Sequence, residues 1–127
     1  MELIAIIAAL ALIEYLVFGL MVGMARGKYK VEAPATSGHP IFERRLRVQT
    51  NTLEQLIVFL PGLVLFGRYV SAPIGVILGA IFILGRIVYS IGYVADPAKR
   101  SVGFVLSYVP VVLLILGGLF GAAAAWF

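Results

Sequence analysis

The sequence contains no cysteine, and this absence excludes disulfide bonds, thiolate metal ligands and a cysteine nucleophile within the protein. It also contains little charge, because only 13% of its 127 residues are Asp, Glu, Lys or Arg. Apolar residues make up 62% of the chain, well above the share of about 45 to 50% that is usual for soluble domains. There is too little charge to coat a soluble domain, so the composition indicates a protein of the lipid bilayer.

What the sequence does contain is four apolar runs, each near or above the roughly 20 residues that a helix needs to cross a bilayer. Lipid offers the backbone no hydrogen-bond partners, so runs of this length are expected to be helical. The sequence therefore predicts an all-α, integral membrane four-helix bundle that forms a single domain over residues 1–127, with helices at about 3–24, 46–69, 73–94 and 102–127. The first run lacks a preceding basic segment and is too long for the apolar core of a signal peptide, so we expect it to be retained.

The basic residues predict the orientation of the bundle. Those expected on one side of the membrane are Arg26, Lys28, Lys30, Arg44, Arg45, Arg47, Lys99 and Arg100. The opposite side has only Arg68. Positive charge collects on the cytoplasmic side of membrane proteins, so we expect both termini to face away from the cytoplasm. The net charge of +4 reflects this topology, and no nucleic-acid partner is expected.

A polar face opens the second helix. Arg47, Asn51 and Glu54 stand at i, i+4 and i+7, so they lie within an arc of about 60°. Such a face can be a solvated helix end with internal salt bridges. However, Asn51 and Glu54 lie inside an apolar run, where polar groups pair with each other or line a wet cavity. We therefore favour a binding site over a solvated end.

A similar narrow arc closes the third helix, where Arg86, Tyr89 and Tyr93 stand at i, i+3 and i+7. These tyrosines are also typical of an interfacial aromatic belt, and Arg86 could snorkel or form a bridge to Glu54. The second helix begins and the third ends on the same side of the membrane, so both polar faces lie at one depth. Together they predict a pocket that binds a polar, anionic ligand through Arg and Tyr donors. Arg100 could cap this pocket or be one more topology charge.

Two motifs connect these residues to a known family. Residues 42–54, FERRLRVQTNTLE, match the pattern F-E-R-x-x-R-x-Q-x-N-x-x-E, and residues 86–93, RIVYSIGY, match R-x-x-Y-x-x-G-Y. In these motifs and in its four-helix layout the chain resembles the MAPEG family, the membrane-associated proteins in eicosanoid and glutathione metabolism. The resemblance is specific, because polar matches at fixed spacing are rare inside membrane helices.

The resemblance implies a homotrimer that binds glutathione between neighbouring subunits at the cytoplasmic end of the bundle. In leukotriene C4 synthase-like members, the positions that bind glutathione from one subunit match Arg47, Asn51, Glu54, Tyr89 and Tyr93. The positions that the next subunit contributes match Arg26 and Gln49. Arg100 matches the arginine that activates the thiol.

The resemblance also implies a reaction. Glutathione would serve as co-substrate, without a metal, and would be transferred to a hydrophobic electrophile or used to reduce a lipid hydroperoxide. The second substrate could enter from the membrane lipid. Two positions depart from the family pattern, because Gln55 stands where those enzymes have a tyrosine and Gly27 where they have a second arginine. The number of glutathione contacts could therefore be lower here.

Two other functions fit parts of the sequence. Glu14 lies near the middle of the first helix, and small multidrug transporters of similar size use a carboxylate there to exchange protons for cationic drugs. The long basic connection and the two motifs are not expected of such a transporter, so we interpret Glu14 as a packing residue that is protonated or hydrogen-bonded. The other alternative is a non-catalytic MAPEG-like protein that binds lipid or partner proteins. The presence of Arg100 argues against it.

The orientation can be tested by labelling, because the chain has no cysteine of its own. We expect single cysteines introduced at Ser37 and Ser101 to react with a membrane-impermeant thiol reagent from the cytoplasmic side, whereas one at Ser71 should not. Reversed labelling would contradict the predicted orientation and remove the argument for a cytoplasmic site.

Overall fold

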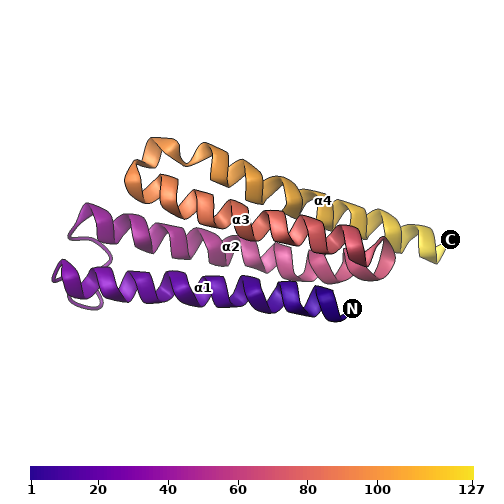
Figure 1. Ribbon diagram of the computed structural model, residues 1–127, viewed down its shortest axis with the longest axis horizontal. Coiled ribbons are helices and arrows are strands. Elements are labelled where there is room, and N and C mark those ends of the chain that lie inside the picture. Colours follow the sequence, from indigo (N-terminus) through magenta and orange to yellow (C-terminus); the bar gives the residue numbers. More distant parts are fainter.

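The computed structural model describes residues 1–127 and contains helices and no strands. The four long helices are α1 (Glu2–Lys28), α2 (Pro40–Tyr69), α3 (Ala72–Ala95) and α4 (Ser101–Trp126), and a short 3-10 helix, η1 (Pro97–Lys99), precedes α4. All four are long and apolar enough to cross a membrane. The predicted all-α, four-helix membrane fold is therefore confirmed (Figure 1).

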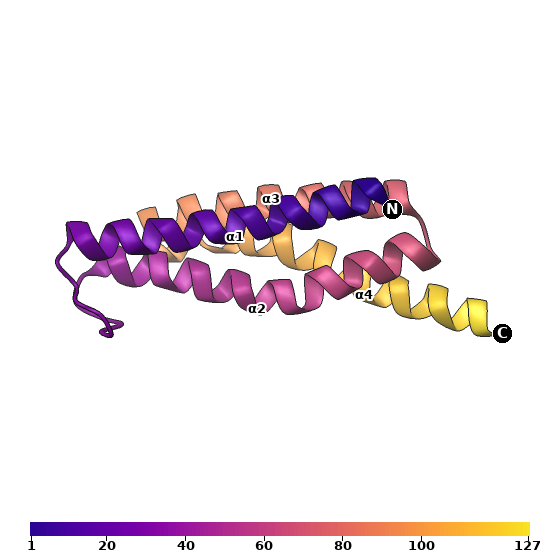
Figure 2. The same cartoon turned by 90° about the horizontal axis from the view of Figure 1, so that it is seen from below.

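The helices run up and down and pack in two layers. Figure 2 shows α1 and α3 in one layer and α2 and α4 in the other. The two termini lie at one end of the bundle, and the α1–α2 connection and η1 lie at the opposite end (Figure 1). The beginning of α2, the end of α3 and the beginning of α4 thus share that second end. The polar residues of the two motifs are brought together there.

The second helix begins earlier than position 46, where the sequence placed its start. His39 caps it, because its ring Nδ1 accepts a hydrogen bond from the Ile41 amide over 3.1 Å, and Pro40 takes the first helical position. Phe42 is fully buried and packs with Val22 of α1 and Val31 of the connection. The apolar run marks the membrane-spanning part of the helix, whereas capping and this small cluster extend it beyond the membrane.

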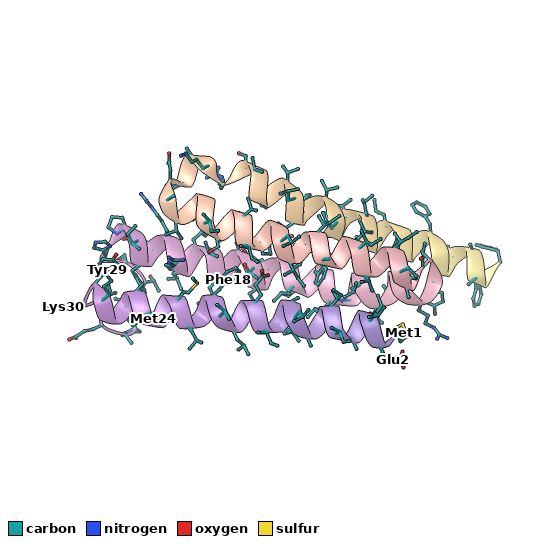
Figure 3. All side chains as sticks on the ribbon, viewed as in Figure 1. Met1, Glu2, Phe18, Met24, Tyr29 and Lys30 are labelled. Carbon is teal, nitrogen blue, oxygen red and sulfur yellow. The ribbon has the colours of Figure 1, made fainter.

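The main core lies where all four helices meet. The rings of Phe59 on α2 and Phe82 on α3 stack with centroids 3.9 Å apart, and both side chains are fully buried. Around them pack Ile4, Ile7, Ala11, Leu56, Leu63, Phe66, Val111 and Leu114. Many other apolar side chains project outward along the whole length of the bundle (Figure 3). An apolar exterior of this kind is suited to contact with lipid.

Two glycines bring α3 and α4 into backbone contact near the polar end. A Cβ atom added to Gly85 would come within 2.7 Å of the Ser107 backbone nitrogen, and one added to Gly103 would overlap the backbone of Tyr89. Small residues allow helix backbones to approach closely, and this is a main source of packing energy between helices in lipid. The close approach places Tyr89 and the first turn of α4 on either side of one pocket.

Candidate functional site

A polar pocket of about 320 Å³ opens at the end of the bundle where α2 begins and α3 ends. It is lined by Arg47, Asn51, Tyr89, Tyr93, Arg100 and Phe104. All except Phe104 are candidate site residues from the sequence. The structure thus brings together residues that lie far apart in the chain, on α2, on α3 and at the start of α4.

Regular helix geometry explains how most of these residues meet. Arg47 and Asn51 are one turn apart on α2, and Tyr89 and Tyr93 are one turn apart on α3. The two tyrosine rings stack with centroids 5.6 Å apart and planes inclined by 13°. Tyr89 is almost completely buried, whereas Tyr93 is partly exposed. The pair therefore runs from the interior of the bundle to the pocket mouth.

Arg100 reaches the pocket through the turn after α3. The Asp96 side chain accepts a hydrogen bond from the Ala98 amide over 3.1 Å, which caps η1. One residue after η1, Arg100 is the N-cap of α4. It is exposed, and its guanidinium forms no ion pair. Its charge is thus available to a ligand.

Arg47 and Glu54 form an ion pair on the exposed side of α2. Arg47 Nη1 lies 3.4 Å from Glu54 Oε1, and the two side chains are about half exposed, at 49% and 56%. Exposed pairs of this kind contribute little to stability, about 0 to 1 kcal/mol. A ligand that carries both a carboxylate and an ammonium can therefore replace this contact at little cost.

Arg86 does not line the pocket, and this corrects the expectation that it would donate to the ligand there. It is completely buried, and its guanidinium donates to Asn51 Oδ1 over 2.7 Å, to Thr52 Oγ1 over 3.0 Å and to Ser107 Oγ over 3.1 Å. Its Cζ lies 4.2 Å from the centre of the Tyr89 ring. Arg86 thus neither snorkels nor bridges to Glu54, and it supports the pocket from behind.

This contact also determines what Asn51 can offer to a ligand. Its Oδ1 accepts the hydrogen bond from Arg86, so its amino group remains free to donate. Asn51 is only 8% exposed, yet it lines the pocket. The pocket therefore presents Asn51 as a hydrogen-bond donor, together with two arginines and two tyrosine hydroxyls.

Arg26 and Gln49 lie away from the pocket of their own chain. Arg26 Nη1 donates to the carbonyl of Ala35 over 2.9 Å, and its guanidinium covers the ring of Phe42. The Gln49 side-chain amide lies against Gly19 of α1. Neither residue lines the pocket that Arg47 and Arg100 line.

The sequence did not single out several residues that hold this end together. Thr52 and Ser107 accept hydrogen bonds from Arg86, and each also donates to a carbonyl of its own helix. Arg44 Nη1 donates to the Val94 carbonyl over 3.0 Å and so satisfies the carboxyl end of α3. Arg44 belongs to the first motif, but motif matching alone gives no partner for it.

Glu14 lies outside the pocket. It is 9% exposed, and neither of its carboxylate oxygens has a hydrogen-bond partner. Its burial agrees with the expectation of a packing residue, and of the two alternatives, protonated or hydrogen-bonded, the structure does not form the hydrogen bond. No group of His, Cys, Asp or Glu side chains in the structure is arranged to hold a metal ion.

These features define a class: an integral membrane four-helix protein with a polar, cation-lined pocket at the end of its bundle. The chain belongs to the MAPEG family, whose family model matches residues 4–120. It is 53% identical over 115 residues to an uncharacterised protein of Synechocystis sp., covering 91% of this chain and 84% of that protein. It is 40% identical over 121 residues to Homo sapiens microsomal glutathione S-transferase 2, covering 95% and 82% of the two chains. With Bos taurus leukotriene C4 synthase it shares 31% identity over 100 residues, covering 76% and 67%.

The role of Arg86 can be tested by replacing it with an apolar side chain of similar length. We expect Arg86→Met to lower the free energy of unfolding by about 3 kcal/mol, because charge-assisted hydrogen bonds are lost and Asn51 Oδ1 is left without a donor. Unfolding in a detergent titration measures the change. Arg68→Met is the control, since Arg68 is exposed and should change stability by less than about 0.5 kcal/mol. If the two substitutions changed the free energy of unfolding equally, the hydrogen-bond network around Arg86 would not stabilise the protein as described.

Proposed function

We propose that this protein is a glutathione-dependent membrane transferase that conjugates glutathione to a hydrophobic electrophile, reduces a hydroperoxide with it, or both. The observation that carries the proposal is the convergence of Arg47, Asn51, Tyr89, Tyr93 and Arg100 on one pocket of a MAPEG-family chain. Relatives named microsomal glutathione S-transferase 2 and leukotriene C4 synthase support the same activity.

The chemistry of the pocket suits glutathione, a tripeptide with two carboxylates, an ammonium and a thiol. Arg47 can bind a carboxylate, and Glu54 beside it can bind the ammonium. The free amino group of Asn51 and the hydroxyls of Tyr89 and Tyr93 can donate to the remaining carboxylate or carbonyl oxygens. The carboxylates and the ammonium of the peptide part thus each have a candidate partner of opposite charge or a hydrogen-bond donor.

Arg100 is the group that we propose to act on the thiol. The thiolate is the nucleophile, and an ordinary cysteine thiol has a pKa of about 8.5. A guanidinium beside it stabilises the thiolate and lowers that pKa, and each unit corresponds to about 1.4 kcal/mol. Guanidinium suits this role because it keeps its charge at every physiological pH. The thiolate then attacks the electrophilic carbon, and a carbon–sulfur bond forms as the leaving group departs.

We further propose that the site is completed in a homotrimer at the cytoplasmic side, with both termini on the opposite side. Arg26 and Gln49 do not line the pocket of their own chain, so a neighbouring subunit would have to supply them. The second substrate, an apolar electrophile or lipid hydroperoxide, would reach the thiolate from the bilayer. The pocket's position at the end of four helices that are long and apolar enough to cross a membrane supports a site near the boundary between lipid and water.

Glutathione binding tests the first part of the proposal. We expect Arg47→Ala or Glu54→Ala to weaken binding by roughly 1.5 to 3 kcal/mol, the scale of a charge-assisted hydrogen bond. Calorimetry on detergent-purified protein gives the affinities, and Arg68→Ala serves as the exposed control. If Glu14→Gln instead abolished binding or transport of a cation while both site variants behaved as wild type, the transporter alternative would replace this proposal.

A second experiment separates catalysis from binding. We expect Arg100→Ala to raise the thiol pKa in the complex and to lower the conjugation rate, while glutathione affinity falls only by the part that thiolate stabilisation contributes. Thiolate absorbance near neutral pH and conjugation rates over a range of pH measure these effects. If wild type held no more thiolate than free glutathione, and Arg100→Ala conjugated at the same rate, the non-catalytic binding protein would be the better interpretation.

A further inference from the structure

A long groove runs along the face of the bundle formed by α1 and α3, away from the polar pocket. Its larger part, about 690 Å³, lies between these two helices and is mainly apolar, with lining residues that include Leu10, Val17, Ile83 and Ile87. A smaller part, about 290 Å³, lies between α1 and the beginning of α2 and includes Met24, Lys28 and Ile41. Met21 and Arg45 line both parts, so the two parts adjoin at these side chains.

One stripe of α1 follows the groove over its whole length. Its residues are spaced three or four apart, as neighbours on one helix face are, and they are Leu10, Glu14, Val17, Met21, Met24 and Lys28. At 1.5 Å per residue the stripe is about 27 Å long. Half of a bilayer, headgroups included, is about 20 to 22 Å thick. One phospholipid of a single leaflet therefore fits lengthwise along this stripe.

The two ends of the groove differ in charge. At the end near the α1–α2 connection, where Figure 3 labels Tyr29 and Lys30, the groove is lined by the cations Lys28 and Arg45. Neither forms an ion pair. Arg45 donates to the Met21 sulfur over 3.7 Å, a weak contact, and the Lys28 ammonium lies 5.4 Å from the Tyr29 ring centre. Two cations without acidic partners thus lie at one end of the apolar groove.

Glu14 does not make the middle of the groove polar. It lines the groove, but both of its carboxylate oxygens are buried inside the bundle. The part of its side chain that faces the groove is therefore its hydrocarbon stem. Below Arg45 the groove offers an almost continuous apolar surface, which suits a hydrocarbon chain and not a second charged group.

We propose that this groove is a binding site for a membrane phospholipid with an anionic headgroup. The phosphate binds to Arg45 and Lys28, and one acyl chain lies along the α1 stripe between α1 and α3. Basic side chains that line a pocket between membrane helices favour anionic lipids, since the charges attract in a region of low dielectric. A zwitterionic lipid fills the same apolar groove, but its headgroup gains less binding free energy from Arg45 and Lys28.

This site is compatible with the proposed trimer. At about 100° per residue, Arg26 projects roughly 160° away from Met24 and Lys28 around α1. The α1 face that would contribute Arg26 to a neighbouring subunit is thus nearly opposite the lipid groove. The inference does not depend on glutathione binding, so either can fail alone.

Fluorescence quenching by brominated lipids tests the inference. Trp126→Phe removes the native tryptophan, and Ile87→Trp places a single reporter in the groove. The full-length protein is reconstituted in mixtures of phosphatidylcholine with dibrominated phosphatidylglycerol or dibrominated phosphatidylcholine. We expect phosphatidylglycerol to associate about five- to tenfold more strongly than phosphatidylcholine. The double variant Lys28→Gln with Arg45→Gln should bind the two lipids equally.

The matched control is Lys30→Gln with Lys99→Gln, which removes the same charge from exposed residues outside the groove and should keep the preference. Native mass spectrometry of protein without the reporter gives a second readout: phosphatidylglycerol should be retained by wild type and lost from the Lys28/Arg45 variant. Equal association of the two lipids with wild type would overturn the inference. So would an anionic preference that survives the loss of Lys28 and Arg45.

Discussion

A single buried guanidinium determines how the polar end of this bundle is built. Arg86 has no exposed surface, and it lies in a membrane-spanning helix where an unsatisfied charge is expensive. Its donors are satisfied by Asn51 and Thr52 on α2 and by Ser107 on α4, so three helices are held in one register. Glu14 on α1 is also buried, but neither of its carboxylate oxygens forms a hydrogen bond with Arg86.

The pocket follows from this arrangement. Asn51 turns its oxygen toward Arg86 and keeps its amino group for a ligand, while the Arg86 guanidinium packs on the ring of Tyr89. Glycine contacts between α3 and α4 bring the first turn of α4, and with it Arg100, beside the tyrosines. An anion in this pocket would thus have Arg47 and Arg100 beside it and the buried guanidinium of Arg86 behind it. The proposed lipid groove lies on the face formed by α1 and α3. Its basic end forms where the end of α1 meets the beginning of α2, at the same end of the bundle as the polar pocket.

Much of this could be predicted from sequence because the constraints are local. Apolar runs reveal membrane helices, and helical spacing places Arg47 with Asn51 and Tyr89 with Tyr93 on common faces. What could not be predicted depends on contacts between helices. Helical periodicity gives the face on which Arg86 lies, but not that Thr52 and Ser107 would enclose it there. The early start of α2 was also missed, because hydropathy detects lipid-spanning residues and not the His39 cap outside them.

Proton release on binding shows most sharply whether the pocket holds glutathione as a thiolate. Calorimetric titrations at pH 7 in two buffers of different ionisation enthalpy give the number of protons released per glutathione bound. Free glutathione is almost entirely a thiol at this pH, since a cysteine thiol has a pKa of about 8.5. If the bound thiol is ionised, nearly one proton is released per occupied site. Binding without proton release, or no binding at all, would contradict the proposal.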